Sequence, residues 1–267
     1  RGGNVIYVTN LNSYGDGSLR EAVETEGART ILFAVAGIIE LDKSIVINNP
    51  YITIAGQTAP NQGITLKGSG LYITTNDVII RHIRIRPGDS ALGHTPEDRD
   101  AIGIGANSYN VIIDHVSASW SIDEVFSTWY EPELITIQYC LVAEALLDSL
   151  HPEGNHSKAM LVGDDTDKIT IHHNIFAHNN DRSPAQVKSG SRCDIVNNIT
   201  YNWGEYGFSF SFDNSPRPVK INLLSNYFKT GPSTTGDFLS EPTGSYSSEI
   251  YLGDNDGDDP LLITYNA

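Results

Sequence analysis

The stretch Ile169-Thr-Ile-His-His-Asn174 decides the fold of this chain, because similar phrases return along the whole sequence. Seven further phrases of the same kind begin at Ile52, Val78, Val111, Ile135, Cys193, Ile221 and Ile250. Their third residues are all aliphatic: Ile54, Ile80, Ile113, Ile137, Ile171, Ile195, Leu223 and Leu252. An aliphatic residue at one place in every phrase is the inward position of a period-2 strand that stacks on copies of itself.

The phrases run from about residue 50 to 255, at intervals of 24 to 34 residues and without a linker. Such a repeat is typical of a solenoid. We therefore expect an all-β chain, a right-handed parallel β-helix, with residues 1–267 forming a single domain. Four phrases have asparagine as their sixth residue: Asn174, Asn198, Asn226 and Asn255. Stacked asparagines can hydrogen-bond along a solenoid axis, so we predict a structural role for them.

Helical spacing is clear only near the N-terminus, at Leu19, Ala22 and Val23. Ser18 and Glu21 form an S-x-x-E capping box just before these residues. A solenoid has to cover the open end of its core. We therefore predict a short helix over residues 18–26 that caps the N-terminal end.

Composition limits the classes of partner. The 267 residues carry a formal net charge of -16, which repels nucleic acid and anionic membranes. No apolar run reaches the roughly 20 residues that a membrane helix needs. An anionic glycan would require local cations.

The two cysteines, Cys140 and Cys193, fall two rungs apart, roughly 10 Å, so we expect buried free thiols. We expect a monomer.

Polar residues gather in or beside two long inserts, which follow the Val78 and Ile135 phrases. Those worth testing are Asp100, Asp123, Glu124, Asp148, Lys158 and Arg182. Glu124, Asp148 and Arg182 all stand 13 residues after a phrase begins, which predicts that they project from one side of the stack. Acids on neighbouring rungs could share a divalent ion, and a set of oxygen ligands suits Ca²⁺. The alternative is ordinary surface charge, with Arg182 paired to Asp181.

Other polar groups favour structural roles. His115, His172 and His173 lie on strands close to the ladder positions, so we expect structural hydrogen bonds. Asp254 to Asp259 looks like a calcium loop, but its glycine stands fourth and its twelfth position is Tyr265. We interpret it as an acidic turn. Gly163-Asp164-Asp165 is interpreted as an ordinary turn.

Three phrases in order, "VIIDHVSASWS" (111–121), "SKAMLVG" (157–163) and "ITIHHNIFAHNNDRSP" (169–184), resemble polysaccharide lyase family 1, the pectate and pectin lyases. "GSLREAVE" (17–24) and "ITIAGQTAP" (52–60) point the same way, so the resemblance covers nearly the whole chain. It implies a secreted enzyme that cleaves polygalacturonate by Ca²⁺-dependent β-elimination.

The resemblance also implies roles for single residues. Arg182 matches the catalytic base, Lys158 a substrate-binding lysine, and Asp100, Asp123 and Glu124 the calcium ligands. A free guanidinium stays protonated, so nearby cations have to disfavour its charged form, and an alkaline optimum is expected.

The chain departs from the family pattern at two places. Val187 stands where the family often has a second arginine, and Lys188 is the substrate-binding substitute, without an arginine's bidentate geometry. Ser127 stands where a further acid is expected, so we expect a calcium site that is thinner than the family's or rearranged.

Three other functions stay open. Methyl-esterified pectin is an alternative substrate, although Asp100 and Asp123 favour the calcium-dependent branch. A β-helix polygalacturonase would need paired catalytic acids, and it has no requirement for Lys158 and Arg182. A non-catalytic β-helix, such as an adhesin, has no reason to place those cations beside acids.

Overall fold

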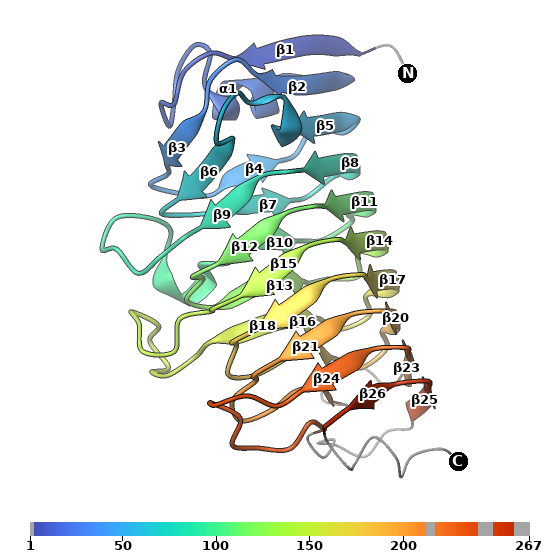
Figure 1. Ribbon diagram of the computed structural model, residues 1–267. Helices are drawn as coiled ribbons and strands as arrows, with labels where there is room; N and C mark the ends of the chain where they lie inside the picture. Colours follow the sequence, from blue (N-terminus) through green and yellow to red (C-terminus); the bar gives the residue numbers. More distant parts are fainter. Residues whose placement is uncertain (1–2, 212–216, 240–247, 259–267) are drawn as a thin grey trace.

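The chain winds into a parallel β-helix in the computed structural model, which describes residues 3–211, 217–239 and 248–258. The inner coils contribute strands to three parallel sheets, and the coils stack from β1 at one end to β25 and β26 at the other (Figure 1). The expected all-β, right-handed parallel β-helix with a short N-terminal helix is confirmed.

The first sheet has ten strands and contains all eight sequence phrases. Its strands are β1 (Asn4–Val8), β2 (Arg29–Phe33), β5 (Ile52–Ala55), β8 (Asn76–Arg81), β11 (Tyr109–Asp114), β14 (Glu133–Gln138), β17 (Asp167–His172), β20 (Arg192–Val196), β23 (Val219–Leu224) and β25 (Ser248–Gly253). The third residues of the phrases pair directly with one another from strand to strand. All are buried in the core except Leu252, which is partly buried.

The repeat begins earlier than the phrases indicated. β1 and β2 add two rungs before Ile52, with Ile6 and Ile31 in register with Ile54. Val8, Ile31 and Phe33 are buried in the same core. The eight phrases therefore did not mark the first two coils of the solenoid.

The second sheet has nine strands. They are β3 (Gly37–Glu40), β6 (Ile64–Lys67), β9 (Arg84–Arg86), β12 (Ser117–Ser119), β15 (Leu141–Ala143), β18 (Ile175–Ala177), β21 (Ile199–Tyr201), β24 (Tyr227–Lys229) and β26 (Asp256–Gly257).

The third sheet has seven strands. They are β4 (Ile45–Ile47), β7 (Leu71–Ile73), β10 (Ile102–Ile104), β13 (Glu124–Thr128), β16 (Lys158–Val162), β19 (Gln186–Val187) and β22 (Ser209–Phe210). Two one-turn 3-10 helices, η1 (Gly56–Thr58) and η2 (Pro96–Asp98), lie in the connections.

The asparagine ladder runs along the turn between the first and second sheets, as expected. Each buried side chain accepts a hydrogen bond from the backbone N–H one coil earlier. Its amide donates to the carbonyl of the third phrase residue one coil earlier, as Asn198 does to Ile171 at 2.9 Å. The ladder joins Asn174, Asn198, Asn226 and Asn255. It ends at Cys140, whose N–H donates to Asn174 Oδ1 at 2.8 Å.

The N-terminal helix α1 (Leu19–Glu24) is shorter than the predicted 18–26 and packs against β1 and β4. The Ser18 hydroxyl accepts from the Glu21 N–H, while the Glu21 carboxylate accepts from the Gly17 N–H at 2.6 Å. Leu19, Ala22 and Val23 are buried, so α1 covers the end of the core. Buried Arg29 donates to the carbonyls of Ala22 and Val23 at the other end of the helix.

The cysteines and histidines with predicted structural roles are found as expected. Cys140 and Cys193 are buried free thiols, as predicted. His115 bonds Asp114 at 2.6 Å, and His172 bonds His173 at 2.8 Å, so their expected hydrogen bonds are present.

The acidic sequence after β25 was interpreted as a turn, and where it is described it bends at Asp254 and then enters strand β26. Asn255 belongs to the ladder and Asp256 begins β26. Asp259 and Tyr265 lie outside the described residues. Within the described part of the chain, no helix has the length and apolar character needed to cross a membrane.

Candidate active site

A groove of about 620 Å³ lies over the outer face of the third sheet. Its floor is a row of paired residues, Tyr72, Gly103, Ser127 and Leu161, from strands β7, β10, β13 and β16. A Cβ on Gly103 would lie 2.6 Å from the Tyr72 ring. Glycine at this position therefore lets the aromatic ring approach the floor of the groove.

The first long insert closes one side of the groove and ends at Asp100. Arg99, just before it, is buried and donates hydrogen bonds to the carbonyls of Gly88, Ser90 and His94. A buried guanidinium needs such acceptors, and here they are backbone groups of the insert itself. Arg99 therefore holds the insert in one shape and fixes the chain at Asp100.

The second insert leads into β16 and delivers Lys158 to the site. Ser157 donates from its hydroxyl to the Ala145 carbonyl at 2.6 Å, which closes the insert at its base. In the backbone register, Lys158 lies next to Glu124 of β13 on one side and next to Asp181 on the other. Successive coils thus place these residues in one row.

The expectation for Asp148 was wrong. Counting 13 residues from the phrase predicted that it would lie in line with Glu124 and Arg182, but Asp148 is exposed in the insert. Lys158 takes that place in the row. The count failed because the insert adds residues before β16 begins.

Three carboxylates, Asp100, Asp123 and Glu124, meet in the groove, and each offers an oxygen within 4.8 Å of the others. Asp100 accepts hydrogen bonds from the Glu124 N–H at 3.1 Å and from the Ser127 hydroxyl. Burial, with the charges of Glu124 and Asp123, raises the pKa of Asp100 well above its usual range. Burial also raises the pKa of Glu124 to about 7, although Arg182 opposes the shift.

Two cations face these acids. Arg182 Nη1 forms an ion pair with Glu124 Oε1, and both side chains are largely buried. Asp181, the partner in the alternative interpretation, instead accepts the backbone N–H of Arg182 at 2.6 Å. Burial, with the charge of Arg182, lowers the pKa of Lys158. The predicted residues Asp100, Asp123, Glu124, Lys158 and Arg182 thus line one groove.

Lys188 also lines the groove, with Nζ 4.9 Å from the centre of the Trp129 ring. Val187, where the family pattern suggests arginine, is buried in the core and pairs with Val162. The strand alternation therefore turns position 187 inward and position 188 outward. This explains why the cation is shifted by one residue.

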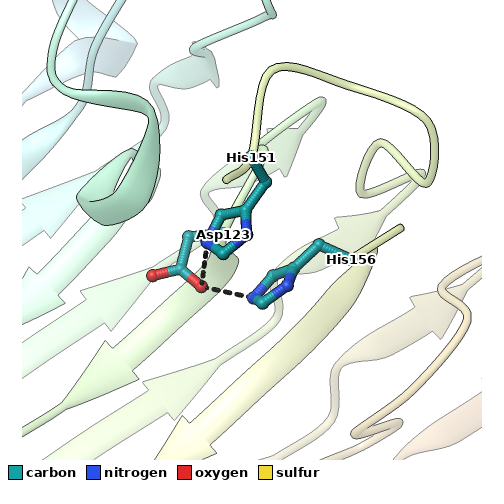
Figure 2. A group of neighbouring side chains, drawn as sticks. All are labelled: Asp123, His151 and His156. Atoms are coloured by element: carbon teal, nitrogen blue, oxygen red, sulfur yellow. Dashed lines mark hydrogen bonds and ion pairs between the residues drawn. The ribbon is translucent and has the colours of Figure 1, made fainter. Parts of the chain in front are cut away.

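The sequence analysis missed two histidines of the site. His151 and His156 are buried in the second insert beside Asp123 (Figure 2). His156 Nε2 lies 2.7 Å from Asp123 Oδ1, and the two imidazole rings stack at 3.6 Å. Burial, with the charge of Lys158, lowers the pKa of His156 to about 4. Their position in the insert that ends at Lys158, as His-Pro-Glu-Gly-Asn-His, was the available signal.

The all-oxygen set Asp100, Asp123 and Glu124 fits a hard divalent cation such as Ca²⁺. Three carboxylates, one buried and two partly buried, have oxygens within 4.8 Å of one another and repel each other, and a bound cation would relieve that repulsion. Asp123, His151 and His156 form a second group of convergent ligand atoms. The first group alone has the donor chemistry that Ca²⁺ prefers.

Known proteins share both the sequence and the fold. A probable pectate lyase C from Aspergillus flavus is 36% identical over 262 residues, which are 96% of this chain and 58% of that relative. The chain is a homologue of the pectate lyases. It spans somewhat less than three fifths of the length of that relative. No family model matches the chain.

Solved structures agree on the fold of this pectate lyase homologue. The cedar pollen allergen Jun a 1 superposes with a TM-score of 0.74 at 22% identity, covering 96% of this chain and 78% of the allergen. A pectate lyase from Bacillus sp. N165, in complex with trigalacturonate, gives a TM-score of 0.70 at 18% identity. That comparison covers 99% of this chain and 86% of the other.

Proposed function

We propose that the chain is the catalytic part of a secreted, calcium-dependent pectate lyase of polysaccharide lyase family 1. Its substrate is de-esterified polygalacturonate, and its product is an unsaturated oligogalacturonide. The observation that carries the proposal is the meeting of Arg182 and Lys158 with three carboxylates in one groove. The homologous pectate lyases support the same activity.

The reaction needs a base, a carboxylate-binding cation and charge neutralisation. Arg182 takes the proton from C5, the C4–C5 double bond forms, and the C4–O bond breaks as the leaving oxygen gains a proton from water. Lys158 and Lys188 bind uronate carboxylates, and Lys158 next to Arg182 holds a carboxylate beside the C5 proton. Asp100, Asp123 and Glu124 would hold Ca²⁺, which when bound neutralises the substrate carboxylate and stabilises the developing negative charge.

The chain's own residues orient the base. The Asp181 carboxylate accepts the Arg182 N–H at 2.6 Å, and Arg182 adopts the left-handed backbone conformation with φ 59°. Glu124 holds the guanidinium end of the side chain. The cations in the groove also offset the electrostatic repulsion between an anionic polyuronate and a protein of net charge -16.

One assay tests the proposal. Ultraviolet absorbance of the unsaturated product is followed on polygalacturonate and on highly methylated pectin, each with Ca²⁺ and with chelator. We expect product from polygalacturonate with Ca²⁺ only. Product from methylated pectin in chelator would indicate a pectin lyase, and new reducing ends without absorbance would indicate a hydrolase.

A further inference from the structure

His151 and His156 form a stacked pair behind Asp123, and the lyase chemistry proposed above does not use them. The two rings lie 3.6 Å apart with an angle of 22° between their planes. Both are buried at the base of the second insert. Figure 2 shows both rings on the same side of the Asp123 carboxylate, whose second oxygen points away from them.

Only His156 is close enough to hydrogen-bond Asp123. Its Nε2 lies 2.7 Å from Asp123 Oδ1, whereas His151 Nε2 lies 3.8 Å away, beyond hydrogen-bond distance. A carboxylate oxygen accepts and an imidazole N–H donates, so we assign the proton to Nε2 of His156. That bond fixes one oxygen of Asp123 and leaves the other directed away from the histidines.

His151 is held by the backbone of its own turn. The Glu153 N–H donates to His151 Nδ1 at 3.2 Å, and the Gly154 N–H donates to the His151 carbonyl at 3.0 Å. Since Nδ1 accepts a hydrogen bond, the ring proton of neutral His151 lies on Nε2. These two hydrogen bonds hold the His151 ring in one orientation, and the His156 ring stacks against it.

The same three side chains could be taken for a site that binds a transition metal, but their geometry opposes it. A metal ligand needs a free lone pair, and Nε2 of His151 carries the proton. In addition, Nε2 of His156 donates its proton to Asp123 Oδ1, so it offers no lone pair to an ion at that point. The two histidines are therefore better placed to hold the Asp123 carboxylate than to bind a metal ion themselves.

We propose that His156 is a positioning residue that orients Asp123 toward a divalent cation, and that His151 keeps His156 in place by ring stacking. This inference rests on the calcium site of the proposed function. Partners that orient a ligand carboxylate typically change metal affinity by about 10- to 100-fold when they are removed.

Paired substitutions at each histidine test the two roles separately. Glutamine places its amide nitrogen where His156 has Nε2, whereas asparagine places it near Nδ1 and cannot reach Asp123. Phenylalanine at position 151 keeps the stacked ring without any ligand atom, and alanine removes it. Calorimetric titration with Ca²⁺ alone is performed on chelator-treated full chain, with melting temperatures as a check on folding.

We expect His156→Asn and His151→Ala to weaken Ca²⁺ binding about tenfold. His156→Gln and His151→Phe should stay within about threefold of the parent, because they keep the donor and the stack. His115→Leu is the matched control. It removes a bond of similar length, 2.6 Å, to Asp114 outside the groove, and should leave Ca²⁺ affinity unchanged.

Three results would overturn the inference. Equal Ca²⁺ affinity in His156→Asn and His156→Gln would show that the donor does not matter. Zn²⁺ binding to the parent that is lost in both His151→Phe and His156→Gln would make the pair metal ligands. Unchanged Ca²⁺ affinity in Asp123→Asn would remove the calcium site and this inference together. A chain that behaves as expected here but releases no unsaturated product would refute only the proposed lyase activity.

Discussion

The asparagine ladder and the groove are two buried polar regions of one solenoid, and they are built in opposite ways. In the ladder, neutral amides repeat from coil to coil, and each donates and accepts along the stack. In the groove, charged groups from different coils meet once, where Glu124 is buried and Asp100 is partly buried. The ladder satisfies its polar groups internally, whereas the groove leaves its carboxylates to be satisfied by a cation.

This difference separates stability from chemistry. A buried polar group with all its hydrogen bonds made contributes to folding, and removing one partner costs free energy. Buried like charges cost folding free energy but have raised pKa values and an affinity for opposite charge. Substitutions in the ladder should therefore change unfolding, and substitutions in the groove should change turnover and cation binding.

The largest effect is expected at Arg182. Arg182→Lys should lower turnover on polygalacturonate by about 10³-fold, within the range for a catalytic proton acceptor, because lysine presents its nitrogen at a different point. The melting temperature should change little. The initial rate of unsaturated product at saturating substrate measures this.

Arg192→Lys is the matched control, because Arg192 forms an exposed ion pair with Asp167 away from the groove. It should keep parental turnover. Near-parental turnover in Arg182→Lys would contradict the role proposed for Arg182, even with the fold unchanged.

A ladder substitution should have the next largest effect, on stability alone. Asn198→Ala removes hydrogen bonds to Ile171, Asn226 and Asn174, and takes away the acceptor of the Asn174 N–H. We expect a loss of about 3 kcal/mol in the free energy of unfolding, with turnover unchanged. Urea unfolding measures it.

Asn222→Ala provides the comparison, because Asn222 bonds Asp194 on the exposed surface of the same coil region. It should cost no more than about 0.5 kcal/mol. Equal losses at positions 198 and 222 would show that the ladder contributes nothing special.

Asp123 should control cation affinity. Asp123→Ala should weaken Ca²⁺ binding about 50-fold, or roughly 2 kcal/mol, as measured by calorimetry, because one of three carboxylate ligands is lost. Asp148→Ala changes an exposed acid in the neighbouring insert and should bind Ca²⁺ as the parent does. An unaffected Asp123→Ala would place the site elsewhere.

The smallest effect is a pH dependence of stability in chelator. The pKa of Glu124 is about 7 in the folded chain and about 4.5 when unfolded, so between these values the folded state holds more protons. Stability should therefore fall as pH rises from about 4.5 to about 7 and then level off. Thermal melts of the parent and Glu124→Gln check this, and parallel pH curves would contradict it.

Much of the fold could be predicted because a solenoid repeats its local rules. The aliphatic third residues mark one position in every phrase, and the asparagines mark a second position in four of them, so the register follows from alignment of the phrases. The phrases did not include the first two coils, although β1 and β2 carry residues in register with Ile54. The capping helix was found from its Ser18 and Glu21 signals, although its ends moved by one or two residues.

Several residues of the site could be predicted because they lie on a strand or beside one. Lys158 and Lys188 follow the strand alternation, and Glu124 begins β13. Asp148 was placed wrongly, and His151 and His156 were missed, because all three lie in the second insert. The path of an insert depends on contacts such as that between Ser157 and Ala145, which no repeat encodes.

By itself the sequence determined the parallel β-helix, the inward column, the ladder and the residue types available for chemistry. These follow from strand period and chain repeat, which are local properties summed along the chain. Only the tertiary structure decided that Arg182 pairs with Glu124 while Asp181 holds its backbone, and that His156 lies against Asp123. Those pairings join residues from different coils and loops. Their distances, burial and charge exist only once the coils are stacked.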